Sequence, residues 1–156
     1  MLFLRVDDNL LHGSIAFSWV RGLKIHQILI ADDLVVKDEF LKMSLGLAKP
    51  KGVQLQTLSI PDSIEFLKNE GNLSLNTLVI VRNLRYVKKI TDQITSFSSI
   101  NIGLNRSIGE VLFQHNGAFL DKEAYQICLD LEEYGIEIEF RLRYDDPIVY
   151  FSDIKK

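Results

Sequence analysis

The sequence contains a single cysteine and no surplus of positive charge. With Cys128 alone, the chain can form neither an internal disulfide framework nor a metal site built on paired cysteines. We therefore expect a protein of a reducing compartment. The formal net charge of −3 argues against nucleic acid as a partner, because phosphate backbones attract basic surfaces.

Long apolar runs are also missing. No uninterrupted run approaches the roughly 18 apolar residues that span a bilayer, and the N-terminal stretch is too polar for a secretory leader. These absences predict a soluble, cytoplasmic protein. The 156 residues, 47% of them hydrophobic, are enough for one globular core, so we expect a single domain over residues 1–156.

Short aliphatic runs alternate along the chain with segments of helical periodicity. This alternation predicts an α/β fold, an open, mostly parallel, doubly wound sheet of about six or seven strands with helices on both faces. The expected strands are 2–6, 27–31, 53–58, 77–81, 100–104 and 137–142. The expected helices are 12–21, 34–48, 61–70, 84–95 and 122–134.

Two of the expected strands differ in their polarity. The run VQLQTL (53–58) alternates apolar and polar residues and favours the sheet edge, whereas TLVIV (77–81) is apolar throughout and favours the middle. The segment VLFQHNGAF (111–119) is too irregular to predict more than a short strand and a turn.

The stretch RVDDNLLHGS (5–14) places a histidine just after the first expected strand. In an open parallel sheet, ligands bind at the carboxyl ends of the strands, and the first turn of the following helix favours an anion. His12 could therefore hold or carry a phosphoryl group. Asp7 or Asp8 could accept a hydrogen bond from one ring nitrogen and so leave a lone pair on the other.

Two other interpretations of this loop are possible. A lone histidine after a strand is more often a helix cap or a structural polar residue than a catalytic one. Adjacent aspartates after a first strand also occur in receiver domains, which bind Mg²⁺ beside a phosphorylated aspartate. The receiver interpretation fails, because VQLQTL runs into Ser59 and Ile60 without a carboxylate and INIGL is followed by no lysine.

The loop resembles that of a known family. RVDDNLLHGSIAFSW is similar to the signature R-I/V-D-D-R-L-I/L-H-G-Q-V…W of IIB components of the mannose/fructose/sorbose-type sugar phosphotransferase system. The similarity continues in order through ILIADD after the second strand, AKPKGV before the third, INIG, and YGIEIE after the last helix. It covers essentially the whole chain.

The resemblance implies a phosphocarrier. In such a protein His12 takes a phosphoryl group, on Nδ1, from a phosphohistidine of the IIA component and passes it to a sugar that arrives through the membrane IIC and IID components. Asp7 and Asp8 would orient the ring and the loop, with no metal and no cofactor. The resemblance further implies a cytoplasmic protein at the periphery of the membrane transporter. It leaves open which sugar is used and whether the chain forms a homodimer.

The chain departs from the family signature at three positions. Asn9 stands where the signature has arginine, Ser14 replaces glutamine, and Leu104 replaces the second of two glycines, while Arg5 and Gly13 are kept. An amide matches phosphate oxygens less well than a bidentate guanidinium. The residues of the loop thus also fit a second function, an interaction or regulatory module that keeps the fold but transfers the phosphoryl group poorly.

A cation from another strand could replace the missing arginine. If strand 77–81 pairs with strand 2–6, Arg82 and Asn83 leave the sheet beside the His12 loop. We hypothesise that Arg82 contacts the phosphoryl group in place of Asn9. The alternative is that Arg82 is a solvated residue at a strand end.

Other residues receive simpler interpretations. Trp19 and Cys128 are expected in the core, and His26 at the amino end of the sheet, away from the crevice. His115 could line the site or cap a turn, and the adjacent Asn-Gly pair favours the turn. Leu10, Leu11 and Phe17 are candidates for an apolar collar on which the IIA component docks, and the alternative for Phe17 is a place in the interior.

Overall fold

The apolar runs of the sequence pair into one seven-stranded sheet with the order β3-β2-β4-β1-β5-β8-β9. Neighbouring strands are parallel from β3 to β8, and β9 is antiparallel to β8. The computed structural model describes residues 1–155. The strands of the sheet are β1 (Leu2–Val6), β2 (Gln27–Ala31), β3 (Gln54–Leu58), β4 (Thr77–Val81), β5 (Ser99–Ile102), β8 (Glu137–Phe140) and β9 (Val149–Tyr150).

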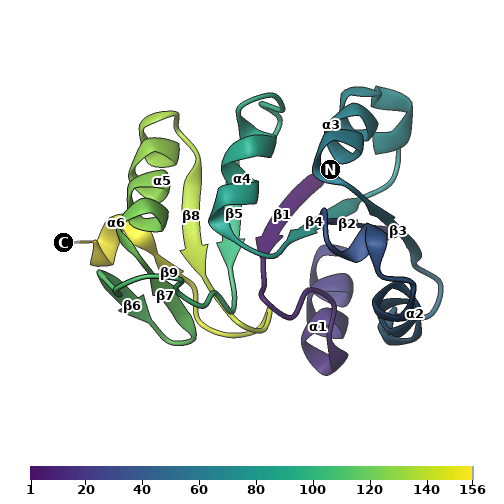
Figure 1. The fold of residues 1–156 in the computed structure, drawn as a ribbon, viewed down its shortest axis with the longest axis horizontal. Coiled ribbons are helices and arrows are strands. Elements are labelled where there is room, and N and C mark those ends of the chain that lie inside the picture. The colour runs from purple at the N-terminus through teal and green to yellow at the C-terminus, as the bar shows by residue number, and fades with distance from the viewer. Residues whose placement is uncertain (156) are drawn as a thin grey trace.

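Helices cover both faces of this sheet, as the sequence predicts. Figure 1 shows α1 and α2 on one side and α3, α4 and α5 on the other. The helical elements are α1 (Gly13–Leu23), η1 (Val35–Lys37), α2 (Glu39–Ala48), α3 (Ile60–Lys68), η2 (Glu70–Leu73), α4 (Leu84–Thr91), α5 (Lys122–Glu133) and α6 (Phe151–Ile154).

Alternate residues of the central strands supply two apolar layers. On β2, Ile28 and Ile30 pack toward the α1 and α2 side, whereas Leu29 packs toward α3 and α4. All five residues of β2 and of β4 are buried, as expected for strands covered on both faces. The predicted places of the strands are confirmed, because β4 lies inside the sheet and the more polar β3 lies at its edge.

The segment 103–121 folds outside the main sheet. It forms the hairpin β6 (Phe113–His115) and β7 (Ala118–Leu120), which turns at Asn116 and Gly117. Asn116 has a φ of +50°, a conformation that asparagine tolerates. The short strand and turn predicted for 111–119 are confirmed. Strand β9 and helix α6 had no counterpart among the expected elements.

Candidate functional site

The loop between β1 and α1 lies at the carboxyl end of the sheet. The Asp7 N–H donates to Val81 O at 2.9 Å, and the Asp8 N–H donates to Leu104 O at 3.0 Å. These bonds fasten the loop to the ends of β4 and β5, the two neighbours of β1. The backbone then turns sharply, with a φ of +58° at Leu10 and +46° at Gly13, the first residue of α1.

The Asp7 carboxylate holds the His12 ring. Asp7 is fully buried, and its Oδ2 lies 3.0 Å from His12 Nε2 and 2.9 Å from Arg5 Nη2. Its Oδ1 accepts the Asn9 N–H at 2.9 Å. An ionised carboxylate can only accept, so Nε2 must carry the proton in this contact. In the neutral ring the lone pair then lies on Nδ1, and the His12 side chain is 29% exposed.

Arg5 lies beside Asp7 and donates a hydrogen bond to its carboxylate. Its side chain is only 3% exposed. Burial lowers the pKa of the Arg5 guanidinium, and the Asp7 carboxylate acts in the opposite direction. The guanidinium also donates to Asn101 Oδ1, to Arg141 O at 3.1 Å and to Leu142 O at 3.0 Å. Carboxylate and carbonyl oxygens thus surround a buried cation and fix its place beneath the loop.

Gly103 leaves the space that Arg5 occupies. A Cβ added at this glycine would lie 2.7 Å from Arg5 Cζ and closer still to Nη2. Gly103 therefore belongs to the site by its lack of a side chain. The neighbouring Leu104 does not have a positive φ, and its side chain packs over Gly117, where an added Cβ would lie 2.5 Å from Leu104 Cδ2. The backbone at position 104 consequently does not require glycine.

Asp8, which the sequence pairs with Asp7, points elsewhere. Its Oδ2 accepts from the backbone N–H of Arg106 and lies 3.3 Å from Arg106 Nε. Arg106 is 78% exposed, so this contact lies at the surface. In the described part of the chain, Asp7 alone of the two aspartates contacts the His12 ring. Asp8 instead ties the loop to the segment after β5.

The residues that replace the family's arginine and glutamine are both exposed. Asn9 contributes its backbone N–H to Asp7, as described above. Ser14 lies in the first turn of α1, and its Oγ accepts from Arg143 Nη1 at 3.1 Å. Arg143 was not among the residues predicted from the sequence. It lies 129 positions after Ser14, and no local pattern links the two.

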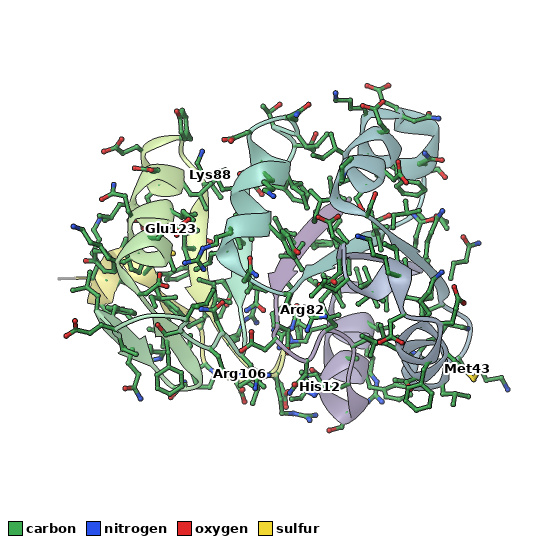
Figure 2. The ribbon with its side chains drawn as sticks, viewed as in Figure 1. His12, Met43, Arg82, Lys88, Arg106 and Glu123 are labelled. Atoms are coloured by element: carbon green, nitrogen blue, oxygen red, sulfur yellow. The ribbon has the colours of Figure 1, made fainter. Side chains whose placement is uncertain are left out.

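Arg82 and Asn83 leave β4 beside the loop, since β4 pairs with β1 in register. Figure 2 shows His12, Arg82 and Arg106 toward the same end of the sheet. Arg82 Nε lies 2.8 Å from Oδ2 of the fully buried Asp32. Asn83 caps α4 by accepting the Tyr86 N–H at 3.1 Å. These contacts assign both residues a structural task, and a contact between Arg82 and the phosphoryl group stays a prediction.

The two side chains that the sequence places in the core are buried. Trp19 is 2% exposed and Cys128 is fully buried, so their places in the core are confirmed. Trp19 also has a polar contact, because its Nε1 donates to Leu142 O at 2.9 Å. His115 lies beside the turn of the β6–β7 hairpin, and His26 precedes β2 at the amino end of the sheet. Both placements agree with the sequence.

The predicted apolar collar is wrong in two of its three residues. Leu10 and Leu11 are each 3% exposed and pack in the core beneath the loop. The positive φ of Leu10 turns the chain so that these side chains point inward. Phe17, the third candidate, is 46% exposed. Within residues 1–155, no helix is long and apolar enough to cross a membrane.

The chain is similar to IIB components over nearly all of its length. It matches the family described as "PTS system sorbose subfamily IIB component" over residues 1–155. It is 24% identical over 149 residues to the sorbose-specific EIIB component of Klebsiella pneumoniae, a match that covers 96% of this chain and 91% of that protein. It is 29% identical over 99 residues to a probable phosphotransferase enzyme IIB component of Streptococcus pyogenes, covering 64% and 61%.

The mannose-specific EIIAB component of Escherichia coli is 23% identical over 150 residues, which cover 96% of this chain but 46% of that protein. The chain thus spans between about half and three fifths of the length of some curated relatives that it matches.

Solved structures agree in fold. The IIBSor domain of the Klebsiella pneumoniae sorbose permease superposes with a TM-score of 0.90 at 23% identity, covering 98% of this chain and 94% of that one. The manxB structure from Thermoanaerobacter tengcongensis gives 0.89 at 20% identity, covering 99% and 94%. With the family match over residues 1–155, the chain belongs to the mannose/sorbose-type IIB components of the phosphotransferase system.

Proposed function

We propose that His12 accepts a phosphoryl group from the phosphorylated IIA component and transfers it to a sugar that arrives through the membrane IIC and IID components. Family membership supports a phosphocarrier role of this general kind. The observation that carries the proposal is the contact of His12 Nε2 with the buried Asp7 carboxylate. This contact leaves Nδ1, on a partly exposed ring, as the nucleophile.

In the first step, the Nδ1 lone pair attacks the phosphorus of the donor phosphohistidine. A new N–P bond forms on His12, the donor N–P bond breaks, and its electron pair returns to the donor imidazole. Positive charge that develops on the His12 ring is stabilised by Asp7, to which Nε2–H donates. The fixed loop holds the ring in place, so little reorganisation is needed.

In the second step, a sugar hydroxyl oxygen attacks the phosphorus. The N–P bond breaks, its electron pair returns to Nδ1, and the hydroxyl proton is taken up there before it passes to water. His12 is then ready for another cycle. This step requires the protein to work beside the membrane transporter from the cytoplasmic side.

A transfer-impaired module is the second candidate function. It is favoured by Asn9, a neutral and exposed residue at the place of the signature arginine. Such a protein would keep the fold and the partner surface while it loses much of the rate.

Phosphorylation of His12 by the IIA component that serves this chain distinguishes the two candidate functions. The chain is incubated with phosphoenolpyruvate, the general phosphotransferase proteins and IIA, and the modified residue is located by mass spectrometry. Phosphate on His12, lost in His12→Ala, supports transfer. The matched control replaces the other two histidines, His26 and His115, and should still be phosphorylated. An unmodified chain beside phosphorylated IIA would favour the second function.

A further inference from the structure

A phosphoryl group on His12 would bring close to two negative charges to the His12 loop, and cationic side chains around the loop could stabilise them. Among the described residues, three of the nearby arginines already face a carboxylate of the site or of its neighbours. Arg5 is buried against Asp7, Arg82 pairs with the buried Asp32, and Arg106 pairs with Asp8. Moving Arg5 or Arg82 would leave a buried carboxylate without its counter-charge, which is costly.

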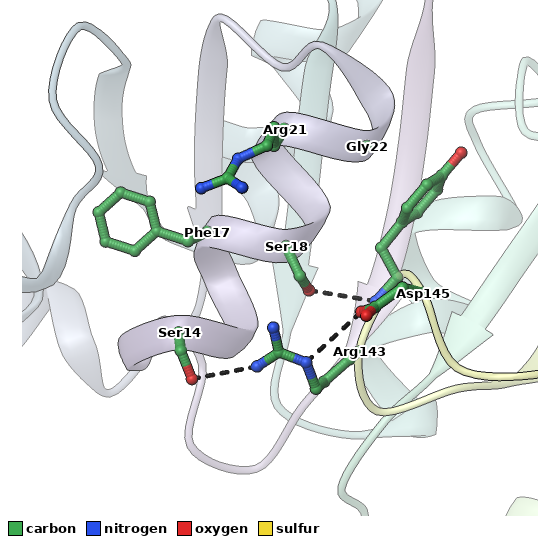
Figure 3. Close-up of a pocket in the computed structure, with 8 residues that line it drawn as sticks. Ser14, Phe17, Ser18, Arg21, Gly22, Arg143 and Asp145 are labelled. Carbon is green, nitrogen blue, oxygen red and sulfur yellow. Dashed lines mark hydrogen bonds and ion pairs between the residues drawn. The ribbon is translucent and has the colours of Figure 1, made fainter.

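Arg143 differs from these three in its partners. Its Nη1 donates to the neutral Ser14 hydroxyl at 3.1 Å, and its Nε lies 3.4 Å from Asp145, whose side chain is 74% exposed. Figure 3 shows the Arg143 guanidinium directly beside Ser14 at the start of α1. Since neither partner is a buried charge, Arg143 can turn toward an anion at little cost.

The segment that carries Arg143 is fastened to α1. The Tyr144 N–H donates to Ser18 Oγ at 3.1 Å, and Ser18 lies one turn after Ser14. The Trp19 indole donates to Leu142 O at 2.9 Å, and Tyr144 packs against the Trp19 ring. The backbone around Arg143 is therefore held against the helix that begins directly after His12. This is the rigid support that a charge-stabilising group requires.

We propose that Arg143 and Ser14 bind the phosphoryl group on His12 and supply the charge that Asn9 cannot. Ser14 Oγ accepts from Arg143, so its own hydroxyl hydrogen is left to donate to a phosphoryl oxygen. The remaining guanidinium N–H groups provide charge-assisted donors beside it, and the free N–H groups of the first turn of α1 add to them. This proposal rests on the proposed function and names further residues for its first step.

Single-turnover transfer from phosphorylated IIA tests the proposal. Arg143→Ala should slow phosphorylation of His12 at least about tenfold, a cautious fraction of what one lost charge-stabilising donor costs in other enzymes. Arg143→Lys should recover part of the rate, because the charge returns without the guanidinium geometry. Ser14→Ala should slow transfer less than Arg143→Ala. The matched control is Arg21→Ala, an exposed arginine seven positions after Ser14 on the same helix, which should transfer at the original rate.

A second measurement separates a charge effect from a structural one. The phosphoryl resonance of phosphorylated His12 is followed by ³¹P NMR as a function of pH. Loss of a nearby cation disfavours the dianion, so Arg143→Ala should move the titration to higher pH, while Arg143→Lys should not. The other charged groups around the loop are the same in every variant: Arg5, Asp7, Asp8, Asp32, Arg82, Arg106 and Asp145.

Three outcomes would overturn the proposal. An unchanged rate in Arg143→Ala would remove Arg143 from the reaction. A slower rate with an unchanged ³¹P titration would show that Arg143 only supports the first turn of α1. A wild-type chain that acquires no phosphate on His12 would contradict both the proposed function and this inference. In the first two outcomes the proposed function survives, because His12 is still phosphorylated.

Discussion

At the scale of single residues, the site is organised around one buried charge. Asp7 receives hydrogen bonds from a guanidinium, an imidazole and a backbone N–H, while no part of its surface reaches water. A carboxylate is tolerated in such a place only when donors satisfy it. The same carboxylate therefore serves two purposes, since it stabilises the buried Arg5 and fixes the proton of His12.

Replacing Asp7 with asparagine should reveal both roles. Asp7→Asn removes the carboxylate that contacts the buried Arg5, and we expect a loss of about 3–5 kcal/mol in the free energy of unfolding. Transfer to His12 should fall by about two to four powers of ten, because the ring loses the group that fixes its tautomer. Urea denaturation and single-turnover transfer measure the two effects.

Asp8→Asn provides the comparison for this variant. Its partner Arg106 is largely exposed, and we expect a change of no more than about 1 kcal/mol in the free energy of unfolding. Equal losses of stability in the two variants would contradict the role given to the buried carboxylate.

Gly103→Ala should act on the same network from the side of the glycine. The added methyl group would overlap the Arg5 guanidinium, and we expect a loss of about 2–4 kcal/mol in the free energy of unfolding, as for other overpacked or displaced buried groups. Gly46→Ala is the matched control. Gly46 lies in α2 with open space around it, so Gly46→Ala should raise the free energy of unfolding slightly, by about 0.5–1 kcal/mol. The midpoints of urea unfolding of the two variants, each compared with the original protein, measure both changes.

How far the sequence predicts this site depends on the distance between partners along the chain. Asp7 and His12 are five positions apart, so their contact could be expected from the loop itself. Apart from Asp7, the partners of Arg5 lie about a hundred positions or more away, in β5 and after β8, and no local pattern joins them to it. For the same reason Arg143 was found only in the folded structure.

At the scale of elements, capping residues explain where the predictions hold and where they fail. The segment 34–48 was expected as one helix, but Asp38 accepts the Leu41 N–H at 3.0 Å and starts α2 after the short η1. Helix α4 ends at Thr91, four positions before the expected end. Periodicity alone could not place these breaks, because the apolar spacing continues through both of them.

The inward direction of the His12 loop gives a prediction at this scale. Leu11→Ala removes a buried side chain from the packing beneath the loop, and we expect a loss of about 2–4 kcal/mol in the free energy of unfolding. Binding of IIA, measured by calorimetry under native conditions, should stay the same. Phe17→Ala, at an exposed position of α1, should change stability by less than about 1 kcal/mol. A Leu11→Ala protein that stays stable but binds IIA more weakly would contradict this prediction and support Leu11 as part of the IIA docking surface.

Asp121 and Arg85 join α5 to α4 and give stability a dependence on pH. Burial alone would raise the pKa of Asp121, but the Ala124 N–H and the Arg85 guanidinium outweigh it, so the pKa lies below its ordinary value. A carboxylate with a depressed pKa stabilises the fold above its unfolded pKa of about 3.9, and this contribution is lost as the pH falls through the folded value.

Asp121→Asn should flatten this dependence. The amide still caps α5 but cannot pair with Arg85, so we expect a loss of about 1 kcal/mol at pH 7 that shrinks below about pH 4. Urea unfolding at a series of pH values measures it. Asp38→Asn, which replaces a cap of the same kind on α2, separates the change of cap from the loss of the ion pair. A loss that stays the same at low pH would contradict the assignment.

At the scale of the whole molecule, the layers follow from the sequence but the order of strands does not. Apolar runs that alternate with helical periodicity predict a parallel sheet covered on both faces, and the structure has this form. The position of β4 between β2 and β1 depends on which strands pair across long stretches of chain. Strand β9 has only two residues, Val149 and Tyr150, too few to show a strand pattern.

Cys128 offers a probe of the whole fold. The thiol is fully buried on α5 within the apolar cluster that joins this helix to the sheet, and burial raises its pKa. Both effects protect it from alkylation, because the thiolate is the reactive form. The thiol should therefore react only when the molecule unfolds. For a domain of ordinary stability, labelling of the native protein should be at least about 10³ times slower than labelling of the denatured chain.

Iodoacetamide labelling across a urea series, followed by mass spectrometry, tests this expectation against the unfolding curve from circular dichroism. If the free energy from labelling agrees with the free energy from circular dichroism, Cys128 becomes accessible only when the whole domain unfolds, since α5 packs against α4 and β8. Rapid labelling without urea, or a rate that does not depend on urea, would instead mean that α5 separates from the sheet by itself. The ion pair of Arg85 with Asp121 could then be tested as the contact that limits this opening, because Asp121→Asn would speed labelling while the far side of the sheet stayed folded.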